Sequence, residues 1–216
     1  MLNKHCISKY KILNLLILTL FVVVLLCISS IEYRQSNIKN VYITKDITNK
    51  QLKQFLIAYH KIPLYIRKKL DKDDIKFYLG GNNIVSNKSG KVIGGRYSIY
   101  KTISPTIELN MITSSDQTVI DQRLLHEVGH LISDLGSRNS MISNSLKWTY
   151  LSNRYYKDTK DIDEFSNVVI TNKEEMFAEC YRIIIMYPEY KFKYPEIYNF
   201  IHHREKVYGQ SEDFEY

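Results

Sequence analysis

Residues 124–134 read LLHEVGHLISD. Two histidines in this stretch, His126 and His130, are four residues apart, and Glu127 follows the first of them. Four residues make about one turn of an α-helix, so both imidazoles can point to the same place. Apolar residues recur at helical spacing through the same stretch, which predicts a helix with one buried face. This apolar stripe consists of Leu124, Val128, Leu131, Ile132 and Leu135.

The HExxH pattern in this stretch is typical of a metal site on a helix. Two neutral imidazole nitrogens suit Zn²⁺, so His126 and His130 are candidate ligands. Glu127 is rotated by about 100° around the helix axis, so its carboxylate can reach a metal-bound water without binding the metal. The alternative is a helix face that carries these residues by chance, because short motifs also occur by accident.

A zinc enzyme needs a third protein ligand, and the position of that ligand separates the known classes. A metzincin would have glycine at position 133 and histidine at position 136, where this chain has Ser133 and Gly136. His202 and His203 are adjacent, so they point to different sides of their helix and suit a surface pair. The acidic segment TNKEEMFAECYR, residues 171–182, is the remaining source of a third ligand.

Three segments, taken in order, resemble one known family. They are residues 124–134, EEMFAECYR at 174–182 and KYPEIYNFI at 193–201. With them the chain resembles the catalytic domains of anthrax lethal factor and of the clostridial Pro-Pro endopeptidases, over much of residues 40–205. The HExxH pattern alone is common, but its combination with an E-x-F-A-E helix near the C-terminus is much more specific.

The resemblance implies that Glu175 is the third zinc ligand and that Glu179 is the second glutamate of the same helix. The spacing agrees, because two glutamates four residues apart allow one to bind the metal while the other accepts a histidine N–H. Glu174 faces another side of the helix and ranks second as the ligand. The family implies a zincin-like metalloprotease fold and hydrolysis of an extended peptide or protein by a zinc-bound water, with Glu127 as the general base.

One position departs from the family pattern. Its members place a tyrosine seven residues before the glutamate ligand, where the hydroxyl helps to stabilise the oxyanion, and this chain has Val168 there. Tyr155, Tyr156 and Tyr181 lie nearby without this spacing. Loss of an oxyanion donor commonly costs about 10² to 10³ in rate. Three interpretations stay open: a zinc metalloendopeptidase, a binding module that has a zinc site but weak or absent catalysis, and an anchored structural protein in which the motif is accidental.

The N-terminal region contains an apolar run, residues 12–28, without a charged side chain. Its length is at the lower limit of about 17 residues for a membrane-spanning helix. Lys4, Lys9 and Lys11 precede the run, and the positive-inside rule then directs the rest of the chain out of the cytoplasm. Residues 1–30 are expected to be a cleaved signal peptide or a retained membrane anchor. The protein is expected outside the cell, either secreted or anchored and facing outward.

The rest of the 216-residue chain predicts an α+β fold after a linker at residues 31–40. A zinc metalloprotease domain is expected at residues 41–216. Within it, a small twisted sheet with helices, residues 41–135, comes before a helical lobe, residues 136–216.

The expected elements can be assigned from local patterns. Ser114 and Gln117 have capping-box spacing before the HExxH helix, and Gly136 can end that helix. Residues 106–111, TIELNM, alternate apolar and polar side chains, which suits an edge strand that pairs with a peptide backbone or an ordinary strand of the sheet. Further strands are expected at 41–44, 75–79 and 98–103, and helices at about 141–156, 172–186 and 195–207.

The chain is basic, with a formal net charge of +7. Three of the lysines precede the apolar run, and the remaining chain has 27 Lys and Arg against 23 Asp and Glu. No arginine-rich stripe or zinc-finger spacing accompanies this charge, so no nucleic-acid partner is expected. Cys180 is the one cysteine after residue 30, which excludes a disulfide within the exported part.

Overall fold

A computed structural model describes most of the chain from Arg34 onward. The chain divides into two units, Met1–Tyr33 and Arg34–Tyr216, and the following account concerns the second. The predicted signal peptide or anchor, residues 1–30, lies outside the described residues except for Ile17. Among the described residues, no helix is long and apolar enough to cross a membrane. The described residues are 17, 34–36, 38–80, 84, 93–100, 103–112, 116–136, 142, 145–159 and 173–210.

The strands of the described residues form a five-stranded sheet in the order β1-β2-β3-β5-β4. β2, β3 and β5 run parallel, whereas β1 pairs antiparallel with β2 and β4 pairs antiparallel with β5. In β5, Ile107 and Leu109 are buried while Glu108 is partly exposed, so one face of the sheet carries the core. The strands are β1 (Arg34–Gln35), β2 (Val41–Ile43), β3 (Lys76–Gly80), β4 (Gly95–Tyr100) and β5 (Ile103–Asn110).

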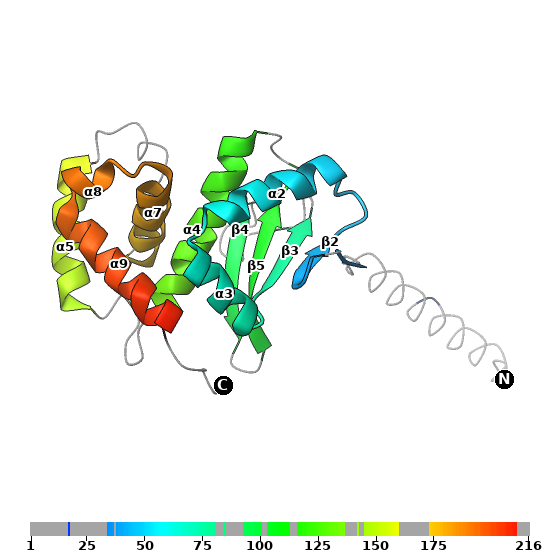
Figure 1. Ribbon diagram of the computed structural model, residues 1–216, viewed down its shortest axis with the longest axis horizontal. Helices are drawn as coiled ribbons and strands as arrows, with labels where there is room; N and C mark the ends of the chain where they lie inside the picture. The colour runs from blue at the N-terminus through cyan, green and yellow to red at the C-terminus, as the bar shows by residue number, and fades with distance from the viewer. Residues whose placement is uncertain are drawn as a thin grey trace, which may run out of the picture. The chain divides into compact units, whose positions relative to one another are not determined.

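Helix α4 joins the sheet to the C-terminal helices. It packs against α2, β4, β5, α7 and α9, and in Figure 1 it lies between the strands on one side and α5, α7 and α9 on the other. This arrangement confirms the expected α+β architecture with helices gathered after the sheet. The helices are α2 (Asn49–Lys61), α3 (Leu64–Lys72), α4 (Gln117–Leu135), α5 (Leu146–Thr159), α7 (Lys173–Met186), α8 (Tyr190–Lys193) and α9 (Pro195–Gln210).

The structure corrects one predicted strand, decides between the two interpretations of another, and places a short strand in the predicted linker. Residues 98–103, predicted as one strand, instead run from the end of β4 to the start of β5. The predicted edge strand, residues 106–111, belongs to β5 apart from its last residue, and β5 lies between β3 and β4. The alternation of apolar and polar side chains in β5 reflects a sheet with one buried face. An interior strand of such a sheet shows the same alternation as an edge strand. The linker at 31–40 contains β1, which pairs with β2.

Both ends of α4 have defined caps. The side chain of Asp116 accepts the N–H of Thr118 at 2.9 Å, so Asp116 is the N-cap. Ser114, the predicted N-cap, lies outside the described residues, and Gln117 is the first residue of the helix. Gly136 ends the helix as predicted, with its N–H bonded to a carbonyl of the last turn at 2.8 Å.

Helices α4 and α7 make backbone contact. A Cβ atom added to Gly129 would lie 2.7 Å from the Cα and 2.9 Å from the carbonyl oxygen of Ala178. No side chain fits in that space, so a glycine is needed for the helices to lie this close. Because both helices carry candidate site residues, this crossing sets the distance between them.

Trp148 of α5 fixes the start of α7. Its indole is fully buried, stacks on Phe200 of α9 and meets Phe177 of α7 edge-on, with ring centroids 5.3 Å apart in each pair. The indole N–H also donates to the carbonyl of Lys173 at 2.9 Å. Lys173 is the first residue of α7, so this bond holds the turn that carries the next two glutamates.

Candidate metal centre

Helices α4 and α7 bring two imidazoles and one carboxylate together. Nε2 of His126 lies 3.2 Å from Nε2 of His130, and Oε2 of Glu175 lies 3.2 Å from the first and 3.5 Å from the second. Within the described part of the chain, this is the cluster of His, Cys, Asp and Glu side chains that could hold a metal ion. The sequence predicted these three residues as the ligands.

The spacing of the three atoms fits a tetrahedral ion. With bonds of about 2.0–2.1 Å to zinc, two ligand atoms of a tetrahedral site lie about 3.4 Å apart. The three separations between His126, His130 and Glu175 are 3.2–3.5 Å. An ion could therefore be held by these side chains with little movement of either helix.

The electrostatics of the cluster also favour a cation. Burial lowers the pKa of His126, but hydrogen bonds to Glu175 and Glu179 raise it to about 10. Hydrogen bonds with His126 and His130 hold the pKa of the Glu175 carboxyl well below its usual range. The site is therefore negative enough to hold a positive charge, which a metal ion can supply in place of a proton.

Glu179 lies behind His126. Its Oε2 is 3.3 Å from Nδ1 of His126, on the opposite side of the ring from Glu175. Only 1% of Glu179 is exposed, and although burial raises its pKa, the hydrogen bonds from His126 and Arg182 lower it below the usual value. A charged carboxylate in this place fixes the orientation and tautomer of the imidazole.

Arg182 holds Glu179 and was missed by the sequence analysis. Its Nε donates to Glu179 Oε2 at 3.0 Å, and its Nη2 donates to Oε1 of the same carboxylate. Arg182 is 5% exposed, so both partners of this ion pair are buried. The i, i+3 spacing of the two residues on α7 is the one sequence signal that indicates the pair.

Glu127 lies against the edge strand β4. Its Oε2 accepts the backbone N–H of Tyr97 at 2.7 Å, and the residue is 7% exposed. Burial raises the pKa of the Glu127 carboxyl above its ordinary value, although the two histidines of α4 and the Tyr97 N–H partly lower it. A buried carboxyl with a raised pKa beside a metal site is suited to accept a proton. No sequence pattern connects Tyr97 with Glu127, because they are 30 residues apart.

The other candidate ligands lie outside this cluster. The cluster that could hold a metal ion includes Glu175 but not Glu174, which the sequence analysis ranked second as the third ligand. His202 on α9 lies 3.2 Å from Oε2 of Glu205 and stacks on Tyr198, and His203 beside it is exposed. The structure thus agrees with the interpretation of these two histidines as residues apart from the metal site.

The structure describes two of the four positions considered for the oxyanion donor. Val168 and the side chain of Tyr156 lie outside the described residues. Tyr181 is fully buried and its hydroxyl donates to Glu205 at 3.1 Å. Its hydroxyl hydrogen is therefore used in a contact with α9. Tyr155 is buried and its ring meets Tyr194 edge-on, with centroids 4.5 Å apart.

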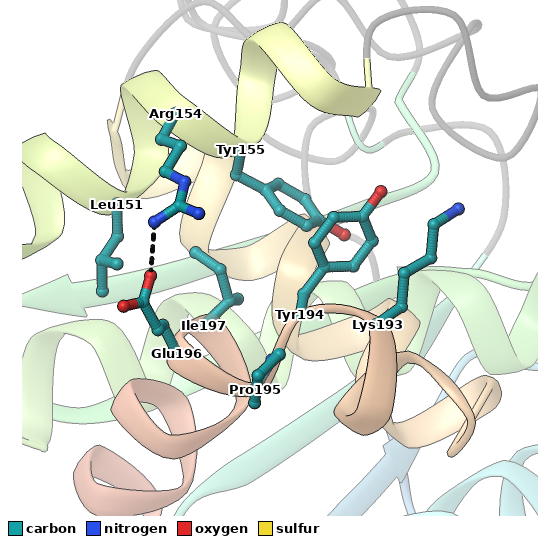
Figure 2. A pocket seen from close by; sticks show the side chains of 8 residues that line it. All are labelled: Leu151, Arg154, Tyr155, Lys193, Tyr194, Pro195, Glu196 and Ile197. Atoms are coloured by element: carbon teal, nitrogen blue, oxygen red, sulfur yellow. Dashed lines mark hydrogen bonds and ion pairs between the residues drawn. The ribbon is translucent and has the colours of Figure 1, made fainter.

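Tyr155 also lines a pocket between α5 and the start of α9. Figure 2 shows Tyr155 and Tyr194 side by side in this pocket, with the ion pair of Arg154 and Glu196 at its other end. The two charged groups lie 2.9 Å apart, and the pocket has a volume of about 290 Å³. None of the three candidate ligands lines it.

Comparison with known proteins shows a similarity among solved structures. No family model and no curated protein matches the chain. Among solved structures, the fold is similar to that of the PRO-PRO endopeptidase from Paenibacillus alvei, with a TM-score of 0.55 and 16% sequence identity. The match covers 76% of this chain and 96% of that protein. At this identity the similarity shows the fold alone, and this fold is like that of a Pro-Pro endopeptidase.

Proposed function

We propose that the protein is a zinc metalloendopeptidase. The observation that carries this proposal is the convergence of His126, His130 and Glu175 at distances suited to a tetrahedral ion, with Glu127 beside them. Two imidazoles and a carboxylate make up a ligand set of catalytic zinc sites that leave one position open for water. The similarity in fold to an endopeptidase supports the same reaction.

The side chains around the centre have separate roles in this proposal. His126, His130 and Glu175 would hold zinc, which supplies a Lewis acid that acidifies water and polarises the peptide carbonyl. Glu127 takes a proton from the attacking water and passes it to the leaving amine. The Tyr97 N–H holds the Glu127 carboxylate in place at 2.7 Å. Glu179 keeps the ring of His126 in its binding orientation.

The substrate is proposed to be an extended peptide that lies along β4. β4 is at the edge of the described sheet and touches Glu127 through Tyr97, so a strand added there would pass beside the metal centre. Addition of a peptide to an exposed strand edge is a common mode of recognition. The sequence analysis considered residues 106–111 for this role beside an ordinary strand of the sheet, and these residues lie one strand further inside, in β5.

Two further features of the proposal come from outside the site. The fold similarity to a Pro-Pro endopeptidase makes proline-rich peptides and surface proteins the first substrates to test. The apolar run at residues 12–28 and the lysines before it support an extracellular location, secreted or anchored to the membrane. Which of these two locations applies depends on whether residues 1–30 are cleaved.

A binding module with a zinc site and weak or absent catalysis is the second candidate. Val168, at the position of the family tyrosine, favours it, because valine has no hydroxyl to donate to an oxyanion. Such a protein would bind zinc and the peptide without turnover. Measurement of turnover therefore separates the two candidates.

The test is a cleavage assay of the purified protein on a peptide library that includes proline-rich sequences. We expect cleavage that a chelator abolishes and added zinc restores. The Glu127→Gln variant should keep zinc, because Glu127 is not a ligand, and should lose about 10²- to 10⁴-fold in rate, because an amide cannot take the proton. Equal turnover by Glu127→Gln would contradict the mechanism, and zinc binding without turnover in the wild type would favour the binding module.

A further inference from the structure

The Glu127 carboxylate lies against the backbone of β4 at two positions, which are two residues apart in the strand. One is the Tyr97 N–H, which donates to Oε2 at 2.7 Å. The other is Gly95, which approaches the second oxygen of the same carboxylate, Oε1. Both positions belong to the same strand, so the strand and the carboxylate fit together as a unit.

A side chain at position 95 would occupy the place of the carboxylate. A Cβ atom added to Gly95 would lie 2.8 Å from Oε1 and 3.0 Å from Cγ of Glu127, and 3.2 Å from the carbonyl oxygen of Glu108. The distance to Oε1 is shorter than non-bonded atoms allow, and the distance to Cγ is tight, so the Glu127 side chain would have to shift. Glu127 is only 7% exposed, so its side chain cannot move freely into solvent. An alanine at position 95 would therefore push the carboxylate away from the Tyr97 N–H.

We propose that Gly95 is a positioning residue for the general base: its missing side chain lets the Glu127 carboxylate reach the Tyr97 N–H. The inference rests on the proposed function, in which Glu127 moves the proton. A general base must lie within hydrogen-bond reach of the proton it takes. A displacement of about 1 Å at such a group can lower the rate by about 10²-fold.

The chain offers a matched control in the preceding residue, Gly94. A Cβ atom on Gly94 would lie 2.7 Å from Nε and 3.1 Å from Cδ of Arg123, and Glu127 is not among the atoms it meets. Arg123 is partly buried and donates from Nη1 to the Asn110 carbonyl at 2.6 Å, so Gly94→Ala also displaces a side chain beside β4 but not the Glu127 carboxylate. Neither glycine has a φ angle in the left-handed region, so alanine at either position keeps a normal backbone conformation.

The experiment measures kcat, KM and zinc affinity for Gly95→Ala and Gly94→Ala in the full chain. We expect Gly95→Ala to lower kcat by about 10- to 100-fold while KM and zinc affinity stay within about threefold of wild type. Gly94→Ala should stay within about threefold of wild type in all three quantities. Equal kcat values for the two alanine variants would overturn the proposal, and so would a loss of zinc by Gly95→Ala that accounts for its lower rate.

Melting temperatures test the contact without any activity. Gly95→Ala should lower the Tm by at least about 3 °C in the wild type, and by clearly less in Glu127→Ala, where the carboxylate is gone and only the Glu108 carbonyl remains close. An equal loss in both backgrounds would overturn the positioning role. If the wild type cleaves no peptide, the proposed function fails, and this comparison still decides whether Gly95 makes room for Glu127.

Discussion

Two groups of the candidate centre, His126 and Glu127, are each held by a neighbour that is not itself a ligand. Glu179 contacts the far nitrogen of His126, and Arg182 in turn binds both oxygens of Glu179. The Tyr97 N–H holds Glu127 in the same way. Such outer contacts commonly contribute 10- to 100-fold to metal affinity or activity. Each of these contacts can be tested separately.

The ligand on α7 can be tested with two adjacent glutamates. Glu175→Ala should weaken zinc binding by more than about 100-fold, because two protein ligands hold zinc poorly and even outer contacts are worth up to that factor. Glu174→Ala is the matched control and should keep wild-type affinity, since Glu174 is not part of the ligand group. Competition with a chromogenic chelator measures both. Loss of zinc by Glu174→Ala with retention by Glu175→Ala would reverse the assignment.

The buried ion pair between Glu179 and Arg182 predicts a joint effect on stability and metal affinity. Arg182→Met leaves the Glu179 carboxylate buried without its main partner, which should lower the free energy of unfolding by about 3–5 kcal/mol. Zinc affinity should fall by about 10- to 100-fold, because Glu179 no longer fixes the His126 ring. Denaturant unfolding and chelator competition measure the two effects.

The control for Arg182 is an arginine in an exposed pair. Arg154 and Glu196 lie 2.9 Å apart, but their side chains are 58% and 62% exposed. Arg154→Met should therefore change the free energy of unfolding by only about 0–1 kcal/mol and leave zinc affinity unchanged. Similar losses for both arginine variants would show that the effect of Arg182 does not depend on its contact with Glu179.

At the scale of the elements, the crossing of α4 and α7 sets the geometry of the centre. Gly129→Ala would normally favour a helix by about 1 kcal/mol, but here the new methyl group meets the Ala178 backbone at 2.7 Å. We expect the helices to separate, with a net loss of about 1–3 kcal/mol in the free energy of unfolding and weaker zinc binding. Gly209→Ala on α9 is the control, because its Cβ would meet the partly exposed side chain of Tyr65 and not the backbone of another helix. A more stable Gly129→Ala variant would contradict the close packing.

The helices and strands also show which features of the fold can be predicted from local sequence patterns. The period of α4 and its end at Gly136 were predictable, because a helix is specified by residues close in sequence. The neighbours of a strand are not specified in this way, so residues 106–111 could be read as an edge strand or an ordinary one, whereas β4 lies at the edge of the described sheet. Gly95 and Tyr97 were missed for the same reason, since only the packing of β4 on α4 brings them to Glu127.

At the scale of the whole molecule, the candidate centre joins two parts of one core. His126 and His130 lie on α4, which packs on the sheet, whereas Glu175 lies on α7 among the C-terminal helices. The buried apolar side chains form one cluster that includes Leu109 of the sheet and Trp148 of α5. A metal ion at the centre would therefore link the two parts of the chain that the sequence analysis separated at residue 135.

This link predicts that zinc stabilises the whole domain. A ligand that binds only the folded state adds about 2.7 kcal/mol when its free concentration is 100 times Kd. For a domain of this size, each kcal/mol raises the Tm by roughly 2–4 °C, so zinc at that concentration should raise it by about 5–10 °C. Glu127→Gln should show the same shift, because it keeps all three ligands, whereas Glu175→Ala should show almost none. Calorimetry on the three proteins with and without a chelator measures this, and an equal shift in Glu175→Ala would mean that zinc binds elsewhere on the chain.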